Sequence, residues 1–587
     1  MTFRNSLERL WVYIPLRRRS QFALLLILML IATAAEIFSI GAVIPFLAVI
    51  ASPDQVFENE LVRPIIELLN IQESNQLLMP LTIIFISGAI LSGFIRMTLI
   101  WLQTRLGYAI GADLSINILR KVLHQPYQVQ IEKNSSEIIA GITNKVNSIA
   151  DGIIIPILII ISTCFILLAV LIISLIVSPA VTLITFSSFI IIYSLIIVFT
   201  RKKIVKISKK IGEEQSRVIK ILQESLGGIR DVLIDGSQEV YCAAYLNSEK
   251  PLRRAQANVH IISNCPRYGV EAFGLTLLGL AALILSNKSG EIILFMPLLG
   301  AIALGAQRIL PMMQQSYASW TYIRASKAPF EDALQLLEQP LPEYTHQKID
   351  PLKFDNNIRL NNIFFRYDKS GPWTLSSLDL QIKKGSRVGL IGETGSGKST
   401  LTDLLMSLLN PTKGSLEIDG VIVTDHNHRN WQCRIAHVPQ SVYLADISIA
   451  ENIAFGVPSA EINPDRVKEA AWRAQIFDTI QSLPQGYDTH VGERGVKLSG
   501  GQRQRIGIAR ALYKQADVII FDEATSSLDH ETEQAVMNAI ESLSKDLTII
   551  VVAHRLSTLK GCDLIVELSG GKIKRKGSYE NIVGQAD

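Results

Sequence analysis

The chain has 587 residues, of which 48% are hydrophobic, and its formal net charge is only +4. That length allows several domains, and the small charge without a basic tract argues against a nucleic-acid partner. The five cysteines are scattered and form no C-x-x-C pair, so the sequence suggests neither a disulfide framework nor a metal site built on thiols.

Long apolar runs dominate the first half of the chain. A helix needs about 20 apolar residues to cross a bilayer, and six runs come near this length. The first is too long for the core of a signal peptide, so we expect it to stay as a membrane anchor. The six predicted spans are roughly 21–50, 78–106, 152–177, 180–200, 266–286 and 291–313.

Basic residues orient these spans. Arginines 17–19 precede the first span and the basic triplet 201–203 follows the fourth, so both places are expected in the cytoplasm. Loop 51–77 carries five acidic residues against a single arginine, which suits the outside. Both ends of the membrane half are therefore predicted to be cytoplasmic.

Two cytoplasmic stretches, 107–151 and 201–264, are too long for unstructured loops. We expect them to extend the spanning helices below the membrane. Breaks at His124–Tyr127 and Leu226–Ile229 mark where each helical hairpin turns and meets another domain. The alternative is a pair of plain charged linkers.

The outer loop contains a segment, Leu61–Leu69, with the pattern of a short amphipathic helix. Such a helix beside a span either lies in the outer headgroup layer or packs on its own protein. The sequence leaves these two alternatives open.

Charged residues inside the apolar runs suggest a substrate site. Arg96 and Arg308 each lie roughly 17 residues from the outer end of their spans, or about 25 Å deep, and Arg267 opens the fifth span at a similar level. Guanidinium groups suit phosphate, so three at one depth predict a receptor for an anionic lipid headgroup such as a pyrophosphate. There are two alternatives to this site. Each arginine side chain extends to the cytoplasmic membrane interface, or Arg267 pairs with Glu271 one helical turn away. Glu36, nearer the outer half, lines the same cavity or bonds a neighbouring helix.

The sequence changes character after the sixth span. A helical stretch runs to Glu338, a polar linker covers 339–355, and 356–587 has the size of one soluble α/β domain. Its segment 392–400, GETGSGKST, fits the loop that wraps nucleotide phosphates, between an expected strand at 387–391 and an expected helix at 401–406. Lys398 is expected to reach the β- and γ-phosphates of ATP, and the Ser399 hydroxyl to ligate Mg²⁺.

Further motifs follow in order within this domain. Tyr367, at the end of an expected strand 364–367, is placed to stack on adenine, and Gln440 to contact Mg²⁺ or the attacking water. LSGGQ at 498–502 opens a second phosphate-binding helix. The strand 518–523 ends in two carboxylates: Asp522 is expected to hold Mg²⁺ and Glu523 to act as general base. His554 ends the strand 548–553, where it would contact the γ-phosphate.

The ordered set GETGSGKS, Gln440, LSGGQ, IIFDE, SSLD and His554 resembles the nucleotide-binding domain of ATP-binding cassette transporters. With six spans ahead of it, the chain resembles an exporter half-transporter. The resemblance implies a homodimer in which each ATP lies between one chain's phosphate loop and the LSGGQ of the other, with coupling helices at the two cytoplasmic breaks. The nucleotide-binding residues it implies are Tyr367, Gly392, Gly395, Gly397, Lys398, Ser399 and Thr400. The signature residues acting in trans are Ser499, Gly500, Gly501 and Gln502. The catalytic residues are Gln440, Glu523 and His554, and the Mg²⁺ ligands are Ser399, Gln440 and Asp522.

Short membrane motifs narrow the resemblance. Segments 35–46, 265–271 and 308–311 are similar to those of bacterial lipid-linked oligosaccharide flippases. This implies an ATP-driven flippase in the bacterial plasma membrane with its nucleotide domain in the cytoplasm. It would move a polyprenyl-pyrophosphate oligosaccharide outward, with Arg96, Arg267 and Arg308 on the pyrophosphate. The alternatives are a general lipid, drug or polysaccharide-intermediate exporter, or an ATP-gated channel or non-transport ATPase.

Overall fold

The computed structural model describes residues 3–51, 74–132, 134–177, 179–286, 292–342, 345, 349–523, 546–553 and 559–583. The chain divides into two compact units. The first comprises residues 1–124 and 133–340, and the second comprises 125–132 and 341–587. A helical membrane half followed by an α/β domain is the predicted fold class, and it is confirmed.

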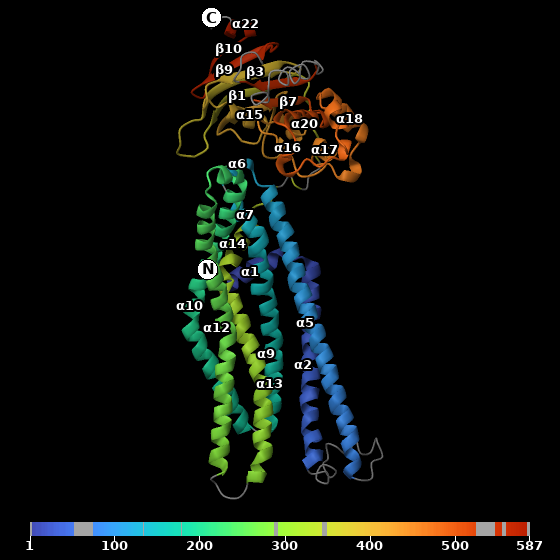
Figure 1. The fold of residues 1–587 in the computed structure, drawn as a ribbon, viewed down its shortest axis with the longest axis vertical. Helices are drawn as coiled ribbons and strands as arrows, with labels where there is room; N and C mark the ends of the chain where they lie inside the picture. The colour runs from blue at the N-terminus through green and yellow to red at the C-terminus, as the bar shows by residue number, and fades with distance from the viewer. Residues whose placement is uncertain are drawn as a thin grey trace. The chain divides into compact units, whose positions relative to one another are not determined.

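The first unit is entirely helical where it is described. Its long helices are α2 (Leu16–Ala51), α5 (Leu78–Leu123), α9 (Ile155–Val177), α10 (Pro179–Gly227), α12 (Gln238–Ser286) and α13 (Ile292–Ala325). The shorter elements are α1 (Phe3–Tyr13), η1 (Ser74–Leu77), α7 (Ser135–Ala140), η2 (Gly141–Lys145), α8 (Val146–Ile149), η3 (Ala150–Ile154), α11 (Ile229–Ile234) and α14 (Lys327–Leu337). Helix α2 packs along α5, and α10 packs along α12 (Figure 1).

Within the described part of the chain, three helical segments are long and apolar enough to cross a bilayer. They are Leu16–Ser39, Leu78–Leu123 and Ser135–Ile176. The predicted fourth, fifth and sixth spans include positions whose side chains lie outside the described set. These three spans therefore remain predictions from the sequence.

The long helices continue past the length that a bilayer requires. Helix α5 has 46 residues and α10 and α12 have 49 each, which at ~1.5 Å per residue gives about 70 Å against a hydrocarbon core of about 30 Å. The chain then breaks after Leu123 and after Gly227, and the short helices α6 (Tyr127–Glu132) and α11 follow. The predicted helical extensions and their breaks are both present.

Helix α6 belongs to the second unit. The Gln128 amide donates a hydrogen bond to the Tyr367 carbonyl at 3.4 Å. Burial raises the pKa of the Tyr127 hydroxyl, with Asp403 and Tyr367 adding to the effect. The helix after the first predicted break therefore belongs to the α/β unit, where the break was expected to meet another domain.

Two sheets form the core of the second unit. The six-stranded sheet has the order β10-β9-β3-β8-β7-β6, with all neighbours parallel except β9 and β10. Its strands are β3 (Arg387–Gly392), β6 (Ile435–Val438), β7 (Val518–Asp522), β8 (Thr548–Val552), β9 (Leu564–Ser569) and β10 (Lys572–Gly577). The apolar runs of β7 and β8 are buried throughout, because both faces of a parallel sheet are covered.

The second sheet is antiparallel, with the order β2-β1-β4-β5. Its strands are β1 (Asn357–Phe365), β2 (Leu375–Lys383), β4 (Lys413–Ile418) and β5 (Val421–Ile422). Strand β1 ends at Phe365, so the expectation that Tyr367 ends this strand is wrong. The strand also starts earlier than expected, because Asn357–Leu360 pair with β2 and Ile358–Leu360 pair with β4 as well.

Helices complete the α/β unit. They are α15 (Lys398–Leu405), α16 (His428–Gln432), α17 (Ile449–Ile453), α18 (Pro464–Arg473), α19 (Phe477–Gln481), α20 (Gly500–Tyr513) and α22 (Tyr579–Val583), with short 3₁₀ turns η5 (Ser459–Glu461), η6 (Gly486–Asp488) and η7 (Glu493–Gly495).

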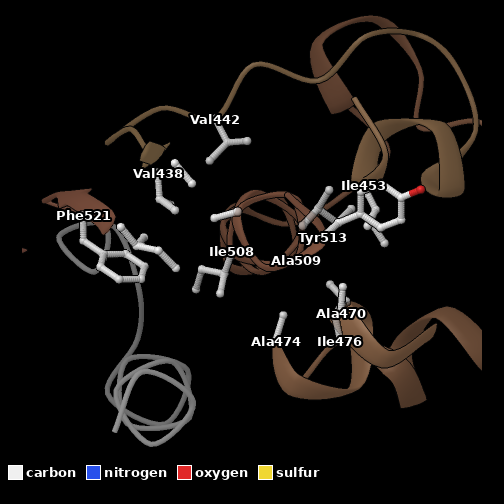
Figure 2. Packing of buried hydrophobic residues seen from close by; sticks show 14 of the residues in the cluster. Val438, Val442, Ile453, Ala470, Ala474, Ile476, Ile508, Ala509, Tyr513 and Phe521 are labelled. Atoms are coloured by element: carbon white, nitrogen blue, oxygen red, sulfur yellow. The ribbon is translucent and has the colours of Figure 1, made fainter. Parts of the chain in front are cut away.

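Helix α20 runs through the centre of one hydrophobic core (Figure 2). Val438 and Val442 lie on one side of it, and Ile453 and Ala470 lie on another. A Cβ atom at Gly507 would come within 2.7 Å of Val442, so glycine allows α20 its close approach to the segment after β6. This packing fixes the start of α20, which carries LSGGQ, relative to the sheet.

Candidate nucleotide site and membrane charges

The loop between β3 and α15 is shaped by glycines with positive φ. Gly392, Gly395 and Gly397 have φ values of 149°, 82° and 100°, in the region that side chains disfavour. Gly397 is the residue before α15, so the backbone N–H groups that follow it point out of the helix start. The helix N-terminus adds partial positive charge in the same place.

Close packing around the loop leaves no room for side chains at two of these positions. A Cβ atom at Gly392 would lie 2.3 Å from the Leu568 carbonyl oxygen, and one at Gly397 would lie 2.6 Å from Leu375. The Ser396 hydroxyl is buried in the loop and has no hydrogen-bond partner among the described residues. Open backbone N–H groups and an orphaned hydroxyl are what a bound phosphate chain requires, so the loop fits ATP.

Lys398 is the buried cation of this loop, with 6% of its surface exposed. Its ammonium group donates to the carbonyls of Gly392 at 2.7 Å and Glu393 at 3.1 Å. Burial lowers the pKa of Lys398, and the carboxylates of Glu523 and Asp522 act in the opposite direction. The loop lysine and the two carboxylates at the end of β7 therefore share one electrostatic site.

Tyr367 lies beyond β1 and is tied to the phosphate loop. Its hydroxyl is 3.1 Å from the Thr400 hydroxyl, and 43% of its surface is exposed. An exposed aromatic ring beside the loop is suited to stack on a base. Ser399, on the first turn of α15, is exposed, so its hydroxyl is accessible to a metal ion.

Gln440 and Glu523 are brought together from the segments that follow two neighbouring strands, β6 and β7. The Gln440 amide donates to the Glu523 carboxylate at 2.9 Å. Glu523 follows the last residue of β7 and has φ of 47°, a conformation that costs energy for a side chain and is often found at functional sites. Its N–H group bonds the Val552 carbonyl at 3.0 Å, so the strained residue is held in place. Asp522 lies immediately before it and is partly buried.

The LSGGQ segment forms a capped helix start. The Ser499 hydroxyl accepts from the N–H of Gln502 at 3.2 Å, and the Gln502 side chain accepts from the N–H of Ser499 at 2.9 Å. This reciprocal cap is the reason why serine and glutamine stand three residues apart. Gly500 and Gly501 form the first turn of α20 between them.

Gln504 was not singled out by the sequence. It is 3% exposed, and its amide donates to the Pro439 carbonyl, next to Gln440, at 3.2 Å. It therefore ties the signature helix to the loop that carries Gln440. The only signal for this role in the sequence is a polar residue on the face of α20 that is otherwise apolar and buried. His554 and the SSLD segment at 526–529 lie outside the described residues.

The membrane half holds a buried polar pair. Glu36 on α2 is 5% exposed, and its carboxylate accepts a hydrogen bond from the Ser92 hydroxyl on α5 at 2.7 Å. Of the two alternatives for Glu36, bonding to a neighbouring helix is therefore present. Arg96 lies one helical turn beyond Ser92 and is half-buried. The first predicted cavity arginine thus lies one helical turn from the serine of this buried pair.

Of the other two arginines, only Arg267 has a described side chain. Arg267 Nε lies 4.0 Å from the Glu271 carboxylate, with both side chains about half exposed at 49% and 48%. Arg308 lies on α13, but its side chain is outside the described set, as is the predicted helix Leu61–Leu69. The structure does not bring the three arginines together in any described contact.

Known proteins match both halves of the chain. A family model described as the ABC transporter transmembrane region matches residues 22–302, and one described as ABC transporter matches residues 375–526. The structure of a bacterial Atm1-family ABC exporter with ATP bound superposes with a TM-score of 0.79 over 97% of this chain and 96% of that chain, at 22% identity. At that identity the likeness concerns the fold alone.

Curated relatives are similar in sequence. The ATP-dependent lipid A-core flippase of Chromohalobacter salexigens is 33% identical over 398 residues, which covers 67% of each chain. That of Francisella novicida is 40% identical over 263 residues, or 45% of this chain and 44% of the relative. That of Ralstonia nicotianae is 42% identical over 250 residues, or 42% of each chain. The latter two alignments therefore span less than half of the relatives' length.

A helical transmembrane region followed by an α/β domain with a phosphate loop defines an ATP-hydrolysing membrane transporter. The chain belongs to the ABC transporter family.

Proposed function

We propose that this protein is a homodimeric exporter that uses ATP to move an anionic, lipid-anchored glycan from the cytoplasmic to the outer leaflet of a bacterial plasma membrane. The observation that carries the ATPase chemistry is the Gln440–Glu523 hydrogen bond beside Lys398. The arginines within the predicted spans support the anionic cargo, and the relatives named lipid A-core flippases support a glycolipid.

The residues at the end of β7 divide the work of hydrolysis. Glu523 accepts a proton from the attacking water, and the Gln440 amide, bonded to the same carboxylate, orients it. Lys398 and the N–H groups of the phosphate loop stabilise charge on the transferred phosphoryl group. His554 completes this set in our proposal. Mg²⁺, held by Ser399, Gln440 and Asp522, would supply further positive charge to the phosphates.

A second copy supplies the other half of each site. The capped helix start at Ser499 presents N–H groups from Gly500 and Gly501 that suit a γ-phosphate. In the proposed dimer these N–H groups and Gln502 face the phosphate loop of the partner. ATP then closes the two domains by contacts that exist only in the closed state, and hydrolysis removes those contacts.

The arginines recognise the cargo by charge. A guanidinium group in a membrane segment is costly unless it meets an anion or a cavity, and Arg96 lies half-buried one helical turn from the serine of the Glu36–Ser92 pair. Arg96, Arg267 and Arg308 would engage phosphate groups of the lipid carrier. Two cargoes carry such groups, a polyprenyl-pyrophosphate oligosaccharide and lipid A-core, and the first is the one that the membrane motifs favour.

The test is ATP-dependent flipping in proteoliposomes of the purified protein. Fluorescent polyprenyl-pyrophosphate oligosaccharide and fluorescent lipid A-core are supplied separately, with Glu523→Gln as the inactive control. Arg96→Ala, Arg267→Ala and Arg308→Ala are expected to lower flipping at least about tenfold while ATPase activity persists. Arg105→Ala is the matched control. It removes an arginine from the same helix as Arg96, but the Arg105 guanidinium lies over the Trp101 ring of its own helix and is not one of the proposed cargo ligands.

Each outcome decides one part of the proposal. Flipping of only one cargo identifies the carrier. Flipping of neither cargo alongside ATP hydrolysis excludes both cargoes and leaves the general exporter. Solute leakage that depends on ATP binding but not on hydrolysis would instead support the gated channel.

A further inference from the structure

A groove of about 530 Å³ lies between α10 and α12 in the membrane half. Ile192, Ile196 and Thr200 line it from α10, and Cys265, Gly269 and Phe273 line it from α12, among others. The Thr200 hydroxyl is bonded to the Ile196 carbonyl of its own helix at 2.8 Å. A thiol is a weak hydrogen-bonding group. The side chains of the groove therefore offer hydrocarbon contact and almost no polar partner.

The position of the groove within the membrane follows from the orientation of the spans. Thr200 is the last residue before the basic triplet 201–203, and Cys265 lies just before the fifth span. The groove therefore covers the cytoplasmic ends of the fourth and fifth predicted spans and continues over about one turn of α12 before the fifth span, from the inner leaflet's hydrocarbon chains to its headgroups. An apolar groove at this depth is solvated by lipid.

Basic residues continue both walls toward the cytoplasm. Lys203 follows Ile196 by seven residues and Thr200 by three, so it lies on the same side of α10, about 5 Å further along. Arg254 precedes Ile261, another lining residue, by seven, so it lies on the groove side of α12, about 10 Å below that residue. Both side chains are exposed.

Acidic residues are missing from the same stretches of sequence. Segment 179–212 of α10 contains no aspartate or glutamate, and neither does segment 254–270 of α12. The first carboxylate beyond them on α12, Glu271, lies near Arg267. The cytoplasmic rim of the groove is therefore cationic and complementary to an anionic headgroup.

We propose that this groove binds one hydrocarbon chain of an anionic phospholipid from the cytoplasmic leaflet, with Lys203 and Arg254 on its phosphate. The inference rests on the membrane orientation in the proposed function, and it concerns a lipid of the surrounding membrane rather than the cargo. Arg267 lies two residues from both Cys265 and Gly269, roughly 160–200° around α12 from them. The Cys265–Gly269 side of the groove thus faces away from the predicted cargo arginine, whereas Val270, three residues from Arg267, borders the side of α12 that carries it.

Gly269 provides a direct way to fill the groove. A Cβ atom there would meet nothing within 4 Å, and its φ is not in the left-handed region, so α12 accepts a side chain at this position. Gly269→Leu places that side chain in the groove. Gly274→Leu is the matched control, because Gly274 lies on the same helix, is equally open and does not line the groove.

The experiment uses the full-length protein in nanodiscs that contain phosphatidylglycerol with a photoactivatable diazirine in one acyl chain. Labelled peptides are mapped by mass spectrometry, without transport or ATP hydrolysis. We expect labelling within 192–200 and 261–273, lowered about fivefold or more by Gly269→Leu and unchanged by Gly274→Leu. Lys203→Gln with Arg254→Gln should lower labelling by phosphatidylglycerol and leave labelling by phosphatidylcholine with the same diazirine chain unchanged.

Several results would overturn this proposal. Absence of labelling in these segments means that another helix, including one from a second copy, covers the groove. Equal labelling by the two headgroups removes the role of the cations. Labelling that Gly269→Leu leaves intact places the lipid elsewhere. If Gly269→Leu does not fold, the exposed Lys203 and Arg254 variants still decide the outcome. Failure of cargo flipping leaves this readout unaffected, so the two proposals fail separately.

Discussion

The Gln440 amide and the Glu523 carboxylate, 83 residues apart in the chain, meet at 2.9 Å. Gln440 lies two residues after β6 and Glu523 lies one residue after β7, and these strands are parallel neighbours. Parallel strands end at the same edge of a sheet, so the pair is a consequence of the topology. It joins the residue proposed to orient water to the residue proposed to accept its proton.

If both residues act on the same water, their substitutions should not add. Glu523→Gln is expected to lower the ATPase kcat by roughly 10²–10⁴-fold, the range for loss of a general base. Gln440→Ala alone should also slow turnover, but it should cost little in the Glu523→Gln background. Steady-state ATPase assays of the four proteins measure this. Fully additive effects on the logarithm of kcat would show that the two residues act independently.

Gly392→Ala tests the close packing of the phosphate loop. The new Cβ atom would come within 2.3 Å of the Leu568 carbonyl oxygen, so the loop must shift and nucleotide binding should be lost. Gly420→Ala is the matched control: its φ is 82° and its Cβ atom would meet nothing within 4 Å, so it should cost only about 1–2 kcal/mol of backbone strain. Binding of a fluorescent ATP analogue and thermal unfolding report the two effects. Normal nucleotide affinity in Gly392→Ala would contradict the prediction.

Ser92→Ala tests the buried pair between α2 and α5. It leaves the Glu36 carboxylate without the Ser92 hydroxyl, and we expect a loss of about 1–3 kcal/mol in the free energy of unfolding. Thr33→Ala is the control, because the buried Thr33 hydroxyl bonds only the Met29 carbonyl of its own helix. Unfolding in detergent, followed by circular dichroism, should show the larger effect for Ser92→Ala. Equal shifts would mean that the Ser92–Glu36 bond adds nothing to helix packing.

The Cys562 thiol should react slowly with alkylating reagents. Burial, together with Asp563, raises its pKa to about 11, against an ordinary thiol pKa of about 8.5. Because the thiolate is the nucleophile, its reactive fraction at neutral pH is roughly 300-fold lower, and the alkylation rate should still rise about tenfold per pH unit between pH 7 and 9.5. Rates of maleimide labelling in single-cysteine variants, with the exposed Cys242 as reference, measure this. A rate for Cys562 that levels off below pH 9 would show that its pKa is not raised.

The sequence alone was sufficient for features that depend on residues close together in the chain. Apolar runs predict spans because a bilayer imposes their length, and three described helical segments are long and apolar enough to cross one. The long charged stretches predicted the extensions of α5, α10 and α12. Residues 392–400 identified the phosphate loop because its glycines and lysine must be contiguous to surround a phosphate. The strands before and after each motif followed from short apolar runs, although β1 was placed too late, because pairing with β2 and β4 on either side starts it at Asn357.

Contacts between distant residues were decided only by the tertiary structure. The Ser92–Glu36 bond, the Gln504–Pro439 bond and the groove between α10 and α12 each depend on which face of one helix meets another element. The period of 3.6 residues per turn predicts which side chains share one face of a helix. Which other element packs against that face depends on the side-chain volumes of both surfaces. The sequence therefore determined which chemical groups are present, and packing determined which of them meet.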